Sequence, residues 1–383
     1  METKKKKILY IVEAMGGGVF TYIVDLANEL VNEYDMYIAY AVRPQTPSDY
    51  KDNFDKRIHL IEVKNFGRVI NPVKDIKALR EVKAIVKKVN PDIIHLHSSK
   101  AGVIGRLAFN GKKNPLFYTP HGYSFLMQNY KFAKRMMFKI IEAVCAKRKC
   151  TTISCSEGEH QETLKLTKRA TYVNNAVNLN DLQKMIDQVE VKEHPYTVFT
   201  LGRICHQKNP ALFNKVAEAM PDVKFLWIGE GELREELKAP NIEVTGWTER
   251  GEALRMSMNA DAFILTSLWE GLPMSLLESM YMKKPCVINN VIGNNDVIHN
   301  GDNGYVSDSV EDFVRGINAI REGRAQEYVE KAYNDMFELY DIKAQARSYI
   351  EIYEKTILGG VYEYEGKKMR FLERLVQKDS LLR

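Results

Sequence analysis

The chain has 383 residues, of which 45% are hydrophobic and 27% charged, and its net charge is +5. This length favours two domains over a single core. No apolar run approaches the roughly 18 residues of a membrane-spanning helix, and the first residues lack the long apolar segment of a secretory signal. The five cysteines show no zinc-ligand spacing. We therefore expect a two-domain cytoplasmic protein with reduced thiols.

The charge is unevenly distributed along the chain. Residues 1–190 contain 31 Lys and Arg against 20 Asp and Glu, whereas residues 191–383 contain 24 against 30. Between Lys100 and Cys150, eleven basic residues accompany a single acid, Glu142. Such a concentration of positive charge attracts nucleic acid, anionic lipid or phosphorylated substrates. Because no nucleic-acid-binding signature accompanies it, we expect no nucleic-acid partner.

Short apolar segments alternate with amphipathic helical segments, a pattern typical of parallel α/β domains. In the first half of the chain, strands are expected at 8–12, 36–42, 92–97 and 116–119. In the second half, they are expected at 197–201, 223–228, 242–244, 262–265 and 286–289. The polar stretch 189–195 separates the two series and is the expected linker.

These two series predict two Rossmann-like domains, at residues 1–188 and 196–340. Ligands of such folds bind outside the carboxyl ends of the parallel strands, so we expect a cleft between the domains. Residues 341–383 are expected to form C-terminal helices that cross back to the first domain.

The segment after the strand at 262–265 carries two carboxylates around an expected helix start. Glu270 lies in the loop, Pro273 marks the start of the helix, and Glu278 lies inside it. The first amides of this helix, those of Met274, Ser275 and Leu276, would be free to bind an anion. Acids beside an anion site suit a ligand that also carries hydroxyl groups, such as a sugar or a ribose. The alternative is a helix start whose acids only complement the helix dipole.

A second segment, at 202–208, places two cations at the same edge of the sheet. Gly202, Arg203 and Lys208 follow a strand and precede a helix, as Glu270 does. Arginine and lysine both bind phosphate oxygens. The alternative is an ordinary solvated loop.

Together these segments resemble the retaining glycosyltransferases of family 4. The glutamate pair with seven intervening residues follows a G-R-x4-K loop, and His121-Gly122 falls where the family has an active-site His-Gly. Further landmarks are the glycines at 16–18 and at 229 and 231. The resemblance spans residues 6–350 and implies the α/β fold called GT-B, in which two Rossmann-like domains face each other across a central cleft.

The resemblance also implies roles for individual residues. Glu278 would hold the ribose hydroxyls of a sugar nucleotide, and Arg203 and Lys208 would bind its diphosphate. Glu270 would contact the sugar that is transferred, and His121 would lie near the reacting centre. The remaining implied contacts of the sugar nucleotide are Gly17, Gly18, Gly202, Gly229, Met274, Ser275 and Leu276. The family retains the anomeric configuration and requires no metal or other cofactor, and this sequence contains no Asp-x-Asp.

The implied function is transfer of a sugar from a nucleotide sugar, expected to be a UDP-sugar, to a growing glycan. The implied acceptor is linked to polyprenyl diphosphate, as in capsular or exopolysaccharide assembly. The alternatives are a sugar-nucleotide epimerase of the same fold and a noncatalytic protein that binds nucleotide sugars. The absence of G-x-G-x-x-G and of a P-loop argues against a dehydrogenase and a nucleotide hydrolase.

The stretch 130–150 predicts an amphipathic helix with one apolar and one basic stripe. The basic stripe contains Lys131, Lys134, Arg135 and Lys139, a pattern typical of a helix lying on an anionic membrane. The expected location is therefore peripheral, at the inner face of the membrane. In the alternative, the apolar stripe packs against the first domain and the basic stripe is merely solvated. Four further cations are candidates for the acceptor's diphosphate: Lys100, Arg106, Lys112 and Lys113.

Two histidines, His95 and His97, end the strand at 92–97. Only one of them is expected to face the cleft. Because no third ligand can be placed beside them, a polar strand end is favoured over a metal site.

Overall fold

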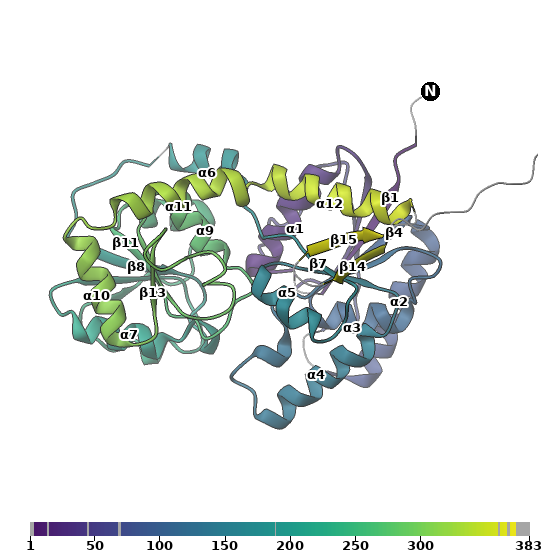
Figure 1. The fold of residues 1–383 in the computed structure, drawn as a ribbon, viewed down its shortest axis with the longest axis horizontal. Helices are drawn as coiled ribbons and strands as arrows, with labels where there is room; N and C mark the ends of the chain where they lie inside the picture. The colour runs from purple at the N-terminus through teal and green to yellow at the C-terminus, as the bar shows by residue number, and fades with distance from the viewer. Residues whose placement is uncertain are drawn as a thin grey trace, which may run out of the picture.

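The structure, a computed structural model, describes residues 4–13, 15–43, 46–67, 70–187 and 189–358, and beyond these the backbone of Val361–Glu365 and Lys368–Leu372. Two α/β lobes lie side by side, each built on one parallel sheet (Figure 1). These are the two parallel-sheet domains that the sequence predicts. Helices were expected up to residue 383, but the backbone of 361–365 and 368–372 pairs as an antiparallel hairpin, β14–β15. The remainder of that C-terminal prediction lies outside the described residues.

The sheet of the first lobe has the order β3-β2-β1-β4-β5-β6-β7. Its strands are β1 (Lys7–Val12), β2 (Asp35–Tyr40), β3 (His59–Glu62), β4 (Ile93–His97), β5 (Leu116–Thr119), β6 (Thr151–Ser154) and β7 (Ala170–Tyr172). Its helices are α1 (Gly17–Leu30), α2 (Pro72–Val89), α3 (Ser99–Ala108), α4 (Phe132–Ala146) and α5 (Glu157–Leu164). The sequence analysis missed the strands β3, β6 and β7.

The sheet of the second lobe has the order β10-β9-β8-β11-β12-β13. Its strands are β8 (Thr197–Leu201), β9 (Lys224–Ile228), β10 (Ile242–Val244), β11 (Ala262–Leu265), β12 (Cys286–Asn289) and β13 (Tyr305–Ser307). The helices around it are α6 (Leu179–Ile186), α7 (Pro210–Ala219), α8 (Arg250–Met258), α9 (Met274–Tyr281), α10 (Val310–Arg321) and α11 (Gln326–Leu339). Of the strands described in this lobe, β13 is the one that was not predicted from the sequence.

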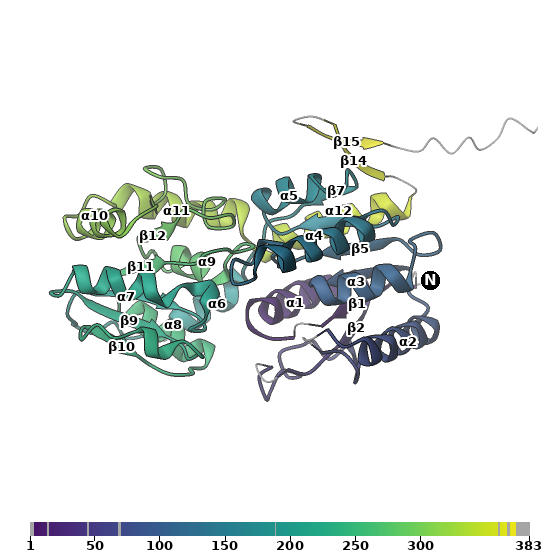
Figure 2. The same ribbon diagram turned by 90° about the horizontal axis from the view of Figure 1, so that it is seen from below.

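Alternate residues of the first-lobe strands point into two separate apolar layers. Ile8 and Tyr10 of β1 pack with α1, whereas Leu9 and Ile11 pack with α2 and α3. This two-sided burial explains why the central strands read as continuous apolar runs instead of alternating ones. Seen from below, α3 lies between α2 and α4 on one side of the sheet (Figure 2).

Helix α12 (Ile342–Ile357) runs from the second lobe onto the first, where it packs beside α1 (Figure 1). Two of its tyrosines are fully buried in the first-lobe core. The Tyr349 hydroxyl lies 2.6 Å from that of Tyr22, and the Tyr353 hydroxyl lies 2.6 Å from Nδ1 of His95. The last helix therefore ties the two lobes together through buried polar contacts.

His95 and His97 both point to the α12 side of the sheet. Their ring centroids are 4.1 Å apart, and both residues are fully buried. The expectation that one of them faces the cleft is wrong, because both are buried on the same face of the strand and neither belongs to the cleft wall. Burial lowers the pKa of both imidazoles well below the usual range, so both rings are neutral at physiological pH.

Candidate functional site

A cleft of about 1790 Å³ lies between the lobes at the carboxyl ends of both sheets. Its wall contains eleven of the twelve residues expected around the sugar nucleotide and the reacting centre: Gly17, Gly18, His121, Gly202, Arg203, Lys208, Gly229, Glu270, Met274, Ser275 and Glu278. The acceptor-side candidates on α4, Lys131, Lys134, Arg135 and Lys139, lie outside this wall. The structure thus brings the cations and the acid pair of the second lobe to one hollow, opposite the first-lobe glycines and His121.

Glu270 is held in place by three neighbouring side chains. Lys208 Nζ lies 2.8 Å from Glu270 Oε1, and the Ser267 hydroxyl donates to the same oxygen at 2.7 Å. The Gln207 amide donates to Oε2 at 3.0 Å. The carboxylate is 8% exposed, so these contacts compensate a nearly buried charge. Sequence reasoning missed Gln207 and Ser267, whose only signal is that they flank the predicted residues.

Arg203 stands in a different environment from Lys208. Its side chain is exposed at the cleft wall, and among the described residues no ion-pair partner approaches it. Lys208, in contrast, is neutralised by Glu270 in this state. Arg203 is therefore the cation of the 202–208 loop that remains available to an anionic ligand.

Glu278 is oriented by Arg250, which begins α8. The Arg250 Nε lies 3.0 Å from Glu278 Oε1, and a terminal guanidinium nitrogen lies 2.8 Å from the same oxygen. Asp25 of α1 belongs to the same cluster from the other lobe. Burial raises the pKa of Asp25 to about 6, although Arg250 opposes the shift. Neither Arg250 nor Asp25 belongs to the quoted motifs, and the sequence analysis missed both.

Two helix starts face each other across the cleft. A Cβ atom added to Gly18, at the start of α1, would lie 3.6 Å from Met274 Cγ, at the start of α9. The amides of Met274 and Ser275 have no acceptor among the described residues, so they are free to bind an anion. The prediction for Leu276 is wrong: its amide donates to the Pro273 carbonyl at 3.1 Å, and its side chain lies in the core, outside the cleft wall.

The loop that carries Glu270 packs directly on the loop that carries His121. A Cβ atom at Gly271 would lie 3.3 Å from the Gly122 amide nitrogen, and that amide donates to Glu159 Oε1 at 2.6 Å. His121 has a left-handed backbone, with φ +54°. Burial lowers the pKa of its imidazole to about 3, so His121 is neutral at physiological pH.

A close backbone contact shapes the floor of the cleft beneath Arg203. Gly229 has φ +143°, and a Cβ atom there would lie 2.2 Å from the Gly202 carbonyl oxygen. That oxygen also accepts a hydrogen bond from the Trp227 indole at 2.8 Å. Only glycine permits this approach between the ends of β8 and β9.

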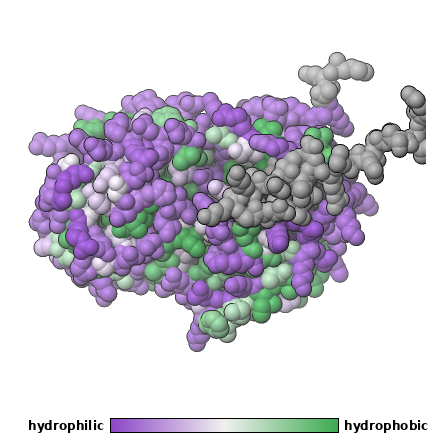
Figure 3. Space-filling view, in the orientation of Figure 1, coloured by the Kyte–Doolittle hydropathy of each residue, from purple (hydrophilic) through white to green (hydrophobic). Residues whose placement is uncertain are grey.

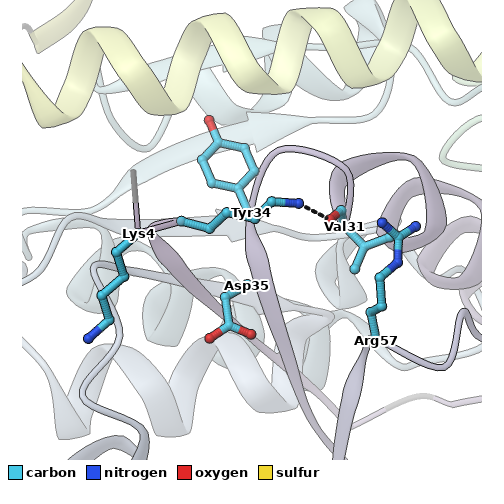
Figure 4. A pocket seen from close by; sticks show the side chains of 6 residues that line it. Lys4, Val31, Tyr34, Asp35 and Arg57 are labelled. Carbon is cyan, nitrogen blue, oxygen red and sulfur yellow. Dashed lines mark hydrogen bonds between the residues drawn. The ribbon is translucent and has the colours of Figure 1, made fainter. Parts of the chain in front are cut away.

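A second hollow, of about 240 Å³, lies at the amino ends of β1 and β2 (Figure 4). Lys5 donates to the Val31 carbonyl at its edge, at 3.0 Å. Since this hollow lies at the opposite edge of the sheet from the cleft, we assign it no ligand. In the part of the chain that the structure describes, no cluster of three or more His, Cys, Asp or Glu is arranged to hold a metal ion.

The apolar stripe of α4 faces outward. Phe132, Met136, Met137, Ile140 and Val144 are between 40% and 75% exposed, and apolar atoms gather over this helix in Figure 3. The alternative that the stripe packs against the first domain is therefore wrong. Among the described residues, none of the helices combines the length and apolar character needed to cross a membrane.

Two of the cations proposed for the acceptor's diphosphate are already paired. Arg106 is 2% exposed and lies 2.6 Å from Glu142, so it is a core ion pair and not a surface cation. Lys100 lies 2.7 Å from Asp75. The assignment of Arg106 to the acceptor is wrong, because a buried guanidinium cannot leave its carboxylate without a large desolvation cost.

Two consecutive parts of the chain match known sequence families. Residues 16–181 match the sequence family described as Glycosyltransferase Family 4, and residues 181–335 match the family described as Glycosyl transferases group 1. Two parallel-sheet domains around a cleft, with these two matches, define a GT-B glycosyltransferase. The chain belongs to glycosyltransferase family 4.

The similar proteins agree with this assignment. A UDP-Gal:α-D-GlcNAc-diphosphoundecaprenol α-1,3-galactosyltransferase of Escherichia coli is 29% identical over 73% of this chain and 79% of its own length. Among solved structures, sucrose-phosphate synthase from Thermosynechococcus elongatus superposes with a TM-score of 0.79 at 15% identity, covering 93% of this chain and all of the other. HepE of Anabaena, solved with UDP and glucose, gives 0.73 at 16% identity, with 91% and 99% covered. At these identities the solved structures show the fold alone.

The contact between Gly229 and Gly202 yields a stability prediction. Gly229→Ala should lower the free energy of unfolding by about 1–3 kcal/mol, because the new methyl group meets a backbone oxygen that cannot move without disturbing two strands. The matched control is Gly251→Ala in α8, where an added Cβ meets nothing within 4 Å. That change should raise stability by about 0.5–1 kcal/mol. Thermal unfolding of both variants measures this, and equal melting temperatures would contradict the predicted clash.

Proposed function

We propose that this enzyme transfers a sugar from a UDP-sugar to the glycan of a polyprenyl-diphosphate-linked acceptor, with retention of configuration. The observation that carries the proposal is the meeting of Arg203, Glu270 and Glu278 with two helix starts in one cleft. Hydroxyl-binding acids and anion-binding amides side by side suit a sugar nucleotide. The Escherichia coli relative is named for a UDP-sugar and a diphosphoundecaprenol acceptor, and HepE was solved with UDP-glucose. Capsular or other exopolysaccharide assembly is the proposed setting.

In the proposed arrangement the second lobe, residues 196–340, binds the sugar nucleotide and the first lobe, residues 1–188, presents the acceptor. Glu278, oriented by Arg250, binds the ribose hydroxyls. Arg203 and the free amides at the start of α9 bind the diphosphate. Glu270, fixed by Lys208, Ser267 and Gln207, binds hydroxyls of the transferred sugar, beside His121.

In the proposed reaction the bond between the anomeric carbon and the diphosphate oxygen breaks on the same face on which the acceptor hydroxyl attacks. A new carbon–oxygen bond forms to the acceptor, and the acceptor's proton passes to the departing phosphate. The negative charge on the leaving UDP is stabilised by Arg203 and by the helix dipoles of α1 and α9, and Lys208 joins them when its contact with Glu270 breaks. Neutral His121 can donate a hydrogen bond without adding charge beside the anomeric carbon.

An epimerase of the same fold is the alternative enzyme. The cleft of about 1790 Å³ exceeds the roughly 300–1,000 Å³ typical of a site for one small ligand. Room for a second substrate favours a transferase. Incubation with a nucleotide sugar alone separates the two, because only an epimerase converts the sugar without an acceptor.

Arg203→Ala tests the role of the free cation. Because the side chain is exposed, the variant should fold normally, while kcat falls about 10²–10³-fold through loss of charge stabilisation on the leaving UDP. UDP release from a panel of UDP-sugars, with and without a GlcNAc-diphospholipid acceptor, measures this. Arg255→Ala, an exposed arginine on α8 paired only with Glu252, is the matched control and should retain wild-type turnover. Wild-type turnover of Arg203→Ala would remove this residue from the mechanism.

We also propose that α4 rests on an anionic membrane surface. Its outward apolar stripe and the neighbouring lysines Lys131, Lys134 and Lys139 fit such a surface. Arg135 is less available, because its Nε donates to the Phe125 carbonyl at 3.0 Å.

Vesicle flotation tests the membrane proposal. Replacing Lys131, Lys134 and Lys139 by Glu should reduce binding to anionic vesicles at least 100-fold, since each lost cation contributes about 1 kcal/mol at such a surface. The charge-matched control replaces three exposed lysines outside the first lobe, Lys192 of the linker and Lys215 and Lys238 of the second lobe, and should bind as wild type does. Equal partitioning of the wild type to neutral and anionic vesicles would refute the electrostatic part of the proposal.

A further inference from the structure

The cleft has an apolar branch away from the residues that we propose for the sugar nucleotide. Away from the acid pair, the same hollow continues over α3, between α2 and α4. Its lining there contains Ile76 and Leu79 of α2, Val103 and Leu107 of α3, and Phe138 and Ile141 of α4. Ile141 thus turns inward, away from the exposed stripe of its own helix.

The charged groups beside this branch are paired with one another. Asp75 pairs with Lys100 at 2.7 Å, and Glu142 pairs with Arg106 at 2.6 Å and accepts the Tyr118 hydroxyl at 3.1 Å. A glycan entering here would exchange hydrogen bonds with water for apolar contacts, which is unfavourable. A hydrocarbon chain would gain from the same contacts. The chemistry of the branch therefore suits an aliphatic chain.

The position of the branch indicates which kind of aliphatic chain it can bind. At one end it joins the part of the cleft that holds Glu270 and His121. At the other it adjoins an apolar surface: of sixteen exposed large apolar side chains in the described residues, nine lie on or next to α2, α3 and α4. These nine are Ile70, Val73, Ile76, Leu107, Phe132, Met136, Met137, Ile140 and Val144. A chain seated in the branch would thus run from an apolar outer face to the reacting centre.

We propose that this branch binds the first isoprene units of the acceptor's polyprenyl chain. This inference rests on the proposed function and names the subsite that recognises the lipid. A prenyl chain is favoured over a free fatty chain because it is covalently attached to the glycan that must reach Glu270. Holding the chain here restricts where the glycan end can lie.

Photolabelling tests the subsite directly. The probe is a prenyl diphosphate with a diazirine on its second isoprene unit, added to the full-length protein in detergent micelles. We expect peptides with Leu107, Phe138 or Ile141 to carry the label, and unlabelled undecaprenyl diphosphate to suppress it at least tenfold. Label restricted to the outer residues of α4, label on the second lobe, or equal suppression by a fatty-acyl phosphate would each overturn the proposal.

A pair of variants links the subsite to acceptor use. Ile76→Asp with Leu107→Asp places two charges in the branch at side chains that are each 54% exposed, so the fold should tolerate them. The KM for a polyprenyl-diphosphate-GlcNAc acceptor should rise at least tenfold, while the KM for a methyl-diphosphate-GlcNAc acceptor, whose alkyl group is too short to enter the branch, stays unchanged. Val191→Asp with Leu339→Asp, at side chains that are 60% and 51% exposed and lie outside the branch, is the matched control and should leave both KM values unchanged.

The outcomes separate this inference from the proposed function. If the wild type glycosylates long and short acceptors with the same KM, the subsite is wrong and the transferase proposal stands. If it glycosylates neither, and photolabelling still marks α3 and the inner face of α4, the lipid subsite stands and the proposed reaction fails.

A separate observation concerns His97, which the proposed mechanism does not use. Its Nδ1 lies 3.1 Å from Nε2 of His121, and its own Nε2 is buried with no hydrogen-bond partner among the described residues. Both rings are neutral, so one of the two nitrogens in this contact carries a proton and donates a hydrogen bond, and the other nitrogen accepts that hydrogen bond. A proton on His97 Nε2 would be a buried orphan N–H, which is rarer in proteins than a buried orphan acceptor. The favoured arrangement has the proton on His97 Nδ1.

We infer that His97 is a positioning residue that fixes the tautomer of His121. With Nε2 of His121 accepting, the proton of its neutral ring sits on Nδ1. Among the described residues, Nδ1 of His121 is not one of the buried atoms that lack a hydrogen-bond partner. It therefore faces the cleft, where it can donate a hydrogen bond. This inference also rests on the proposed function, because the bound sugar is the expected acceptor of that hydrogen bond.

Nitrogen NMR of protein with isotope-labelled histidine tests, independently of turnover, whether His97 fixes the tautomer of His121. We expect one Nδ1–H tautomer of His121 in the wild type and a mixture in His97→Ala, with kcat lowered about tenfold and the KM for the UDP-sugar changed less than twofold. His97→Gln, whose amide can still donate, should restore part of the tautomer preference and of kcat. Since the pKa of His121 is about 3, its protonation should leave no inflection in kcat between pH 5 and 8. An Nε2–H tautomer in the wild type, or no change in His97→Ala, would overturn the inference.

Discussion

The contact between the Glu270 loop and the His121 loop is the constraint on which the site depends. Glu270 is pinned from its own lobe by Lys208, Ser267 and Gln207, while Gly271 packs on Gly122 of the other lobe. The Asn175 amide of the first lobe adds a hydrogen bond to the Leu272 carbonyl, at 2.9 Å. Because α9 begins directly after this loop, the same contacts set where its free amides point. A shift of the loop would therefore move the acid, the amides and the inter-lobe contact together.

Helix α12 is a second connection between the two lobes, in addition to the contact between the Glu270 and His121 loops. Its tyrosines enter the first-lobe core although the residues just before it, in α11, pack on the second lobe. The histidine column of His95, His97 and His121 runs from this helix to the cleft, with His95 bonded to Tyr353 at one end. His95 bonds Tyr353 and Thr119, and His97 bonds His121, while His95 and His97 contact each other by ring packing at 4.1 Å between centroids. The last helix of the second half is thus connected to the cleft wall of the first.

The central strands could be predicted because each is a continuous apolar run in the sequence. The second-lobe wall could be predicted because its residues directly follow the ends of predicted strands. The strands β3, β6, β7 and β13 were missed, since they are short and carry polar residues such as those of Thr151–Ser154. Leu276 was misjudged because one residue of helix register decides whether an amide is free or bonded. Arg250 lies 28 residues before Glu278, so only tertiary structure brings the two together.

The two sides of the cleft differ in the physics that builds them, and this explains why one was predictable and the other was not. The sugar-nucleotide side consists of charged and glycine residues placed by strand ends, which leave a motif in the sequence. The proposed acceptor side is an apolar branch made by three helices packed in a row, where each helix contributes two side chains at ordinary helical spacing. Such residues cannot be told from core residues in one sequence. Part of the positive charge between Lys100 and Cys150 lies on the helices of this branch, but Arg106 shows that some of it is internal pairing and not recognition. What distinguishes the acceptor side is therefore exposure of apolar side chains, a property that only the folded chain reveals.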